Sequence, residues 1–220
     1  RSSRPILDLP LFKVTGYGFG LIVLICHYIS LGAIMLLASF FFIDHLGFSA
    51  TKAGAFIMLY SLMRVFIAPF TGYILRFISP WYLSAIGLIL ICGSLVWSSF
   101  LAVSGSEASI FIALLLIGIG SGIYEPPNTL TIMSSVPPDR YGTASASIAS
   151  GRQLAFALGV AMCGAINAGR EKLYNVGEIT QSQYLSLSFS YALLACAIFA
   201  GIGLILSFIA ASRDRRTKNL

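Results

Sequence analysis

The sequence predicts an all-α membrane protein in which six transmembrane helices form one bundle. Of its 220 residues, 57% are hydrophobic and only 10% are charged, and the mean hydropathy is +0.88. This composition is typical of a chain surrounded mostly by lipid. A spanning helix needs about 20 apolar residues, and six stretches reach that length. They lack the sustained alternation of barrel strands, so helices are expected.

The six predicted spans follow one another with little chain between them. They cover residues 14–43, 53–75, 77–103, 108–133, 143–168 and 185–211. Most connections are short, so neighbouring helices should run antiparallel; the longest link, 169–186, is polar. Residues 1–13 form a leader, whose amphipathic part is expected on the inner membrane surface. The bundle occupies residues 14–211, and residues 212–220 form a basic cytoplasmic tail.

The basic residues predict that both termini face the cytoplasm. If the N-terminus is inside, nine of the fourteen Lys and Arg residues fall on the inner side and three fall outside. Arg64 and Arg152 lie within spans. This asymmetry satisfies the positive-inside rule. Lipid headgroups then account for the net charge of +6, and no nucleic-acid partner is expected.

Small residues and prolines indicate how the spans pack. The first and fourth spans each contain three glycines at alternate positions, which favours close helix approach: Gly16, Gly18 and Gly20, and Gly118, Gly120 and Gly122. Pro69, Pro126 and Pro127 remove backbone N–H groups within spans. The double proline is the stronger candidate for a kink.

Glu125 is the only carboxylate inside the apolar stretches, and Pro126, Pro127 and Asn128 follow it directly. An acid at membrane depth is costly, and by default it indicates a functional site. Ser121, Glu125 and Asn128 follow the i, i+4, i+7 spacing of one helix face, with Thr129 at its edge. This polar stripe is expected to face the bundle interior, with Tyr124 either lining a cavity or packing against a neighbour.

Two arginines are candidate partners for Glu125. Helix rise places Glu125 about 12 Å and Arg152 about 14 Å from the inner ends of consecutive spans, so the two could meet. Arg64, in the middle of the second span, is the rival. A carboxylate that leaves water tends to take up a proton, whereas a nearby arginine favours its charged form. Glu125 is therefore either a protonation site or a structural ion pair, and Arg64 either contacts substrate or only pairs; for Arg152 a structural role is favoured.

Few other side chains indicate chemistry. His27 in the first span could relay protons, although a lone interior histidine is more often a packed group with its hydrogen bonds satisfied. The four cysteines and two histidines show no metal-ligand spacing. No metal-binding His-Glu-x-x-His, paired intramembrane aspartates or Ser-His arrangement is present. No enzyme activity, metal or cofactor is expected.

Several segments resemble the carboxy-terminal half of major facilitator transporters, most closely the fourteen-helix drug:proton antiporters. They are Leu-Asp-Leu-Pro-Leu-Phe at 7–12, Gly-Phe-Ser-Ala-Thr-Lys-Ala-Gly at 47–54, Gly-Ile-Gly-Ser-Gly-Ile-Tyr-Glu-Pro-Pro-Asn at 118–128, Val-Pro-Pro-Asp-Arg-Tyr-Gly-Thr-Ala-Ser at 136–145 and Ser-Gly-Arg-Gln-Leu at 150–154. The resemblance implies two inverted three-helix repeats in a bacterial cytoplasmic membrane. It also implies an amino-terminal bundle, in the same polypeptide or a separate chain, and alternating access.

The resemblance and the charged residues together predict proton-coupled export of drugs or other small amphipathic molecules. Glu125 would couple protons or bind a substrate cation, Arg64 and Arg152 would be its charge partners, and Ser121, Tyr124, Asn128 and His27 would line the cavity. Two alternatives stay open: a proton-coupled transporter of another solute, including an importer, and a non-transporting half-bundle with an assembly or sensing role. The chain opens with Arg1 rather than Met, so a fragment or processed subunit is expected.

Overall fold

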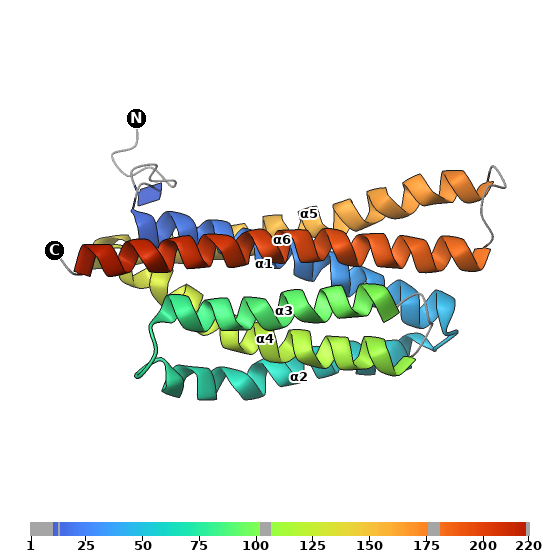
Figure 1. Ribbon diagram of the computed structural model, residues 1–220, viewed down its shortest axis with the longest axis horizontal. Helices are drawn as coiled ribbons and strands as arrows, with labels where there is room; N and C mark the ends of the chain where they lie inside the picture. The colour runs from blue at the N-terminus through green and yellow to red at the C-terminus, as the bar shows by residue number, and fades with distance from the viewer. Residues whose placement is uncertain (1–10, 13, 102–106, 176–180, 219–220) are drawn as a thin grey trace.

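The computed structural model describes residues 11–12, 14–101, 107–175 and 181–218, and within them the chain is a bundle of six α-helices without strands (Figure 1). The helices are α1 (Thr15–Phe40), α2 (Ala50–Ile74), α3 (Pro80–Leu101), α4 (Glu107–Ser134), α5 (Tyr141–Asn175) and α6 (Gln181–Lys218). A π-helical turn, η2 (Phe41–His45), extends α1, and a 3-10 turn, η4 (Pro138–Arg140), precedes α5. The predicted fold class is confirmed.

The predicted spans and the helices differ most in the last third of the chain. Because α5 continues to Asn175 and α6 begins at Gln181, most of the link predicted over 169–186 is helical. Helix α6 also continues to Lys218, through most of the predicted tail. Hydropathy marks the part of a helix that lies in lipid, whereas Arg, Lys and Glu are good helix formers beyond it. Apart from residues 11–12, the predicted leader lies outside the described residues.

Five helical segments of the described chain are long and apolar enough to cross a membrane. They are Thr15–Ile43, Ala50–Ile74, Pro80–Phe100, Pro138–Ile166 and Ser190–Arg213. Helix α4, which is not among them, contains the polar run from Glu125 to Asn128. It nevertheless packs against α1, α2 and α3. The polar segment is therefore held inside the bundle, where protein rather than lipid surrounds it.

The main helix contacts leave one side of the bundle open. Helix α1 packs against α5 and α6, and α4 packs against α2 and α3. Contacts between α3 and α6 close one side. Helices α2 and α5 make no substantial contact with each other and lie at opposite edges (Figure 1). On the side away from α3 and α6, helices α1 and α4 therefore lie between α2 and α5. We call this side of the bundle the α2/α5 face.

Glycines set the closest approaches between helices. Gly32 of α1 faces the carbonyl of Phe156 in α5, and Gly159 of α5 faces the carbonyl of Ile29 in α1. A Cβ at either glycine would overlap that oxygen. The glycines of α4 make similar approaches: Gly118 and Gly122 meet α2, and Gly120 meets α3. The close packing predicted for the α4 glycines is confirmed.

A buried hydroxyl supports α4 where the two prolines interrupt its backbone hydrogen bonding. The helix continues through Pro126 and Pro127. Pro126 has no N–H, so the carbonyl of Gly122, four residues earlier, lacks its usual donor. The buried Thr71 hydroxyl of α2 lies 3.0 Å from that carbonyl oxygen and donates to it. A neighbouring helix thus satisfies a backbone acceptor that lipid could not satisfy.

Removal of this hydroxyl should destabilise the protein. Thr71→Val keeps the side-chain shape but leaves the Gly122 carbonyl without a donor, so we expect the free energy of unfolding to fall by about 1 kcal/mol. Thr71→Ser retains the donor and is the matched control. Thermal unfolding of the purified complete protein in detergent checks this. Equal stability of the Val and Ser variants would contradict the assignment.

Candidate functional site

The carboxylate of Glu125 lies where three helices meet. Its side chain, on α4, is 16% exposed. The Tyr28 hydroxyl of α1 donates to Glu125 Oε1. From α2, Arg64 Nη1 lies 3.3 Å from the same oxygen and forms an ion pair with it. Glu125 is thus held by one neutral and one charged donor, and Arg64 remains 35% exposed.

Arg152, the other candidate partner, forms no ion pair with Glu125. Its Nη2 donates to Thr129 Oγ1 of α4 at 3.3 Å, and its Cζ lies 5.5 Å from the centroid of the Tyr28 ring. Its Nε is buried without a hydrogen-bond partner. Helices α4 and α5 are consecutive but make few contacts, because α5 packs mainly on α1. Matched depth therefore does not bring Arg152 and Glu125 into ion-pair distance.

The other polar residues of the α4 stripe are buried in helix interfaces. Asn128 Nδ2 donates to the Gly20 carbonyl of α1 at 3.1 Å, which fixes α1 against α4. The Ser121 hydroxyl and Asn128 Oδ1 are buried without a hydrogen-bond partner. Tyr124 is 1% exposed and packs beside Gly87 of α3. Ser121, Tyr124 and Asn128 are therefore buried between the described helices, and their place along a central cavity stays a prediction.

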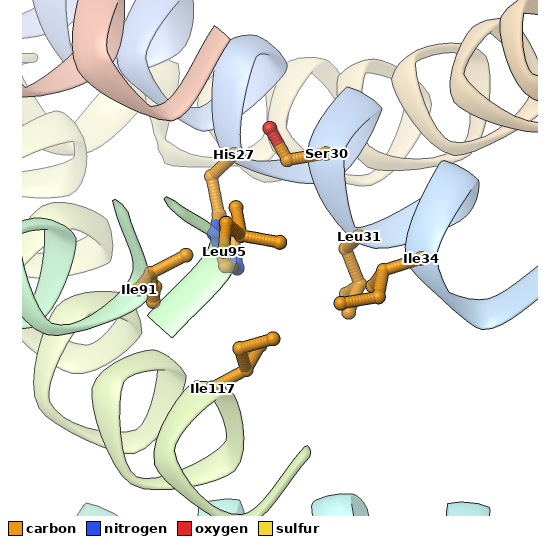
Figure 2. A pocket seen from close by; sticks show the side chains of 7 residues that line it. All are labelled: His27, Ser30, Leu31, Ile34, Ile91, Leu95 and Ile117. Atoms are coloured by element: carbon orange, nitrogen blue, oxygen red, sulfur yellow. The ribbon is translucent and has the colours of Figure 1, made fainter. Parts of the chain in front are cut away.

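His27 lies beside a small cavity between α1, α3 and α4. Figure 2 shows the lining side chains, which are His27, Ser30, Leu31, Ile34, Ile91, Leu95 and Ile117. The cavity volume of about 10 Å³ is close to the minimum for one water molecule. The imidazole is buried, its centroid lies 4.6 Å from that of the Tyr124 ring, and neither ring nitrogen has a hydrogen-bond partner. His27 is thus an interior residue, as the sequence predicts. The sequence also favours a histidine with satisfied hydrogen bonds, but both ring nitrogens lack a partner.

The sequence does not predict the role of Tyr28, and it places Thr129 only at the edge of the polar stripe. Tyr28 contacts both Glu125 and Arg152, and Thr129 accepts from Arg152. A tyrosine within an apolar span carries a hydroxyl that usually requires a partner, which is the signal that could have identified Tyr28. Thr129 lies four residues after Glu125 and therefore on the same helix face.

The charged groups at membrane depth gather on the α2/α5 face. Arg64 comes from α2, Glu125 from α4 and Arg152 from α5, while Tyr28 of α1 links the last two. Among the described residues, no group of three or more His, Cys, Asp or Glu side chains is placed to hold a metal ion. The arrangement offers an ionisable carboxylate and two guanidinium groups. It can exchange a proton and form ion pairs.

The chain is similar to bacterial transport proteins that are longer than it is. It is 27% identical over 209 residues to the riboflavin transporter RibZ of Clostridioides difficile, covering 94% of this chain and 46% of that protein. It is 26% identical over 158 residues to the uncharacterized transporter YebQ of Escherichia coli, covering 72% and 35%. It is 26% identical over 168 residues to the multidrug resistance protein Stp of Mycobacterium tuberculosis, covering 76% and 31%.

The chain therefore spans about a third to a half of the length of these curated relatives. A family model described as Major Facilitator Superfamily matches residues 2–160, which is well over half of the chain. This match, together with the six-helix bundle, shows that the chain belongs to the Major Facilitator Superfamily, a family of transporters rather than enzymes.

Proposed function

We propose that the complete protein exports drugs or other small amphipathic molecules in exchange for protons, and that this chain supplies its carboxy-terminal bundle. The observation that carries the proposal is the Glu125 carboxylate, held between Arg64 and Tyr28 on the partly exposed α2/α5 face. The multidrug resistance relative supports an export function. The bacterial relatives support a bacterial cytoplasmic membrane, where both termini would face the cytoplasm.

The proposed proton step is an exchange of partners at Glu125. In the structure the negative charge is compensated by Arg64 and by the Tyr28 hydroxyl. When the α2/α5 face opens to water, a proton can reach the carboxylate and remove its charge. The neutral acid no longer holds Arg64, so the guanidinium becomes available to substrate or to the facing amino-terminal bundle. Alternating access would open the face to each side of the membrane in turn.

Substitution of Glu125 tests this role. Glu125→Gln keeps the size of the side chain but cannot exchange a proton, so we expect proton-driven drug transport to fall about 10-fold or more. Transport down a drug gradient should persist. The measurement is uptake into proteoliposomes that contain the complete gene product, with the proton gradient intact and collapsed.

The matched control is Glu107→Gln, at the first residue of the same helix. It removes a carboxylate at the helix end and should leave gradient-driven transport unchanged. If Glu125→Gln alters neither transport nor its dependence on the proton gradient, the coupling role is wrong.

Transport of another solute is the second candidate. It is favoured by the similarity to the riboflavin transporter, which covers 94% of the chain. The same proteoliposomes distinguish the two functions: riboflavin uptake with no drug transport would favour the second. A complete gene product that transports neither class, by itself or with a partner bundle, would instead favour an assembly or sensing role.

A further inference from the structure

The cluster on the α2/α5 face carries one positive charge in excess. The described parts of the six spans contain one carboxylate and two guanidinium groups at membrane depth. Glu125 is paired with Arg64. Arg152 forms no ion pair with a described acidic residue; its polar and aromatic contacts are with the Thr129 hydroxyl and the Tyr28 ring. An unpaired cation at this depth is costly, and an anion beside it would reduce that cost.

The surroundings of Arg152 hold its guanidinium in place without neutralising it. The Thr129 hydroxyl accepts from Nη2 at 3.3 Å, and the Tyr28 ring lies within the range of a cation–π contact. The Nε atom is buried and has no hydrogen-bond partner. Guanidinium nitrogens form two parallel hydrogen bonds with a carboxylate. Arg152 therefore retains donor capacity and charge for such a group.

The position of Arg152 also fits a ligand site. Only 22% of the residues in the apolar stretch of α5 are buried, and α5 borders the α2/α5 face beside α1. Arg152 lies nine residues after Thr143, where the sequence predicts the start of its span, which is about 14 Å along the helix. A lipid phosphate at the membrane surface would not reach that depth, whereas a solute in a central cavity would.

We propose that Arg152 is an anion-recognition site, and that the transported molecules include amphipathic compounds with a carboxylate or similar anionic group. The anion would bind the Arg152 guanidinium, with the Thr129 hydroxyl beside it, while Glu125 remains available for the proton step. This inference rests on the proposed transport function and deepens it, since it assigns substrate charge to a residue other than the proton site.

Paired ligands that differ only in charge test the proposal. The probes are aromatic carboxylates and their primary amides, with 2-naphthoate and 2-naphthamide as the first pair. Binding to the complete gene product in detergent at pH 7 is measured by calorimetry. We expect wild-type protein to bind the acids more tightly, and Arg152→Gln to weaken acid binding about 10-fold or more while leaving amide binding nearly unchanged.

Two further variants control for fold and geometry. Arg152→Lys keeps the charge but loses the planar guanidinium, so an intermediate acid affinity is expected. Arg170→Gln removes an arginine near the outer end of the same helix and should change neither affinity. Retained amide binding by Arg152→Gln shows that the fold is intact.

The proposal is overturned if wild-type protein binds acids no more tightly than amides, if no acid binds, or if Arg152→Gln weakens both equally. The last result would indicate a structural arginine, or one that pairs with an acid of the amino-terminal bundle. The binding assay uses no proton gradient. A negative result in it therefore counts against the anion site at Arg152 and not against proton coupling at Glu125. Gradient-driven transport that persists without an acid preference would refute the anion site alone.

Discussion

Gly159→Val is expected to lower the free energy of unfolding of the complete protein by about 3 kcal/mol or more. A Cβ at Gly159 would overlap the Ile29 carbonyl of α1, and that oxygen belongs to backbone that cannot rotate away. The two helices would have to separate, which would weaken the α1/α5 interface that orients Arg152. Thermal unfolding in detergent, followed by circular dichroism, measures the effect.

The same helix offers a matched control. Gly164 lies five residues later on α5, and a Cβ there would meet no atom within 4 Å. Gly164→Val should therefore leave the unfolding midpoint nearly unchanged. Equal destabilisation by the two substitutions would show that valine perturbs the helix itself, and the close approach of α1 and α5 would not be the cause.

Arg64→Gln is the second substitution with a large expected effect. It removes the ion-pair partner of Glu125, which is only 16% exposed. Loss of one partner from a fully buried pair costs about 3–5 kcal/mol. Because the Arg64 side chain is 35% exposed, solvent screening reduces the expected loss to about 1–3 kcal/mol. Chemical unfolding of the complete protein measures it.

A double-mutant cycle separates the pair from the rest of each side chain. The variant with both Arg64→Gln and Glu125→Gln leaves no unpaired carboxylate at position 125, so it should be more stable than Arg64→Gln alone. We expect a coupling energy of about 1 kcal/mol or more. Strictly additive effects would mean that the pair makes no contribution and that each residue acts through other contacts.

The sequence predicted the fold class, the approximate spans and the glycine contacts because each depends on local pattern. Apolar length identifies a spanning helix wherever its neighbours lie, and small residues permit close approach to any partner. Hydropathy could not place the ends of α5 and α6, since polar residues continue both helices beyond the apolar stretch.

The sequence also identified Glu125, Arg64 and Arg152, but not which of the arginines contacts the acid. Helix rise gives the height of a residue along its helix and says nothing about which helices are neighbours. The choice between the two arginines depends on α4 packing against α2 rather than α5. The contact between Tyr28 and Glu125 could not be predicted either, because it requires α1 to lie beside α4.

The double contact of Tyr28 has a consequence for energetics. The Tyr28 hydroxyl donates to Glu125, and the Tyr28 ring lies against the Arg152 guanidinium. One side chain therefore contacts both the proposed proton site and the proposed anion site. Thermodynamic linkage is reciprocal: if an anion at Arg152 changes the proton affinity of Glu125, protonation changes the anion affinity by the same factor. The proposed antiport requires such interdependence between proton and substrate, and Tyr28 would supply it through its contacts with both residues.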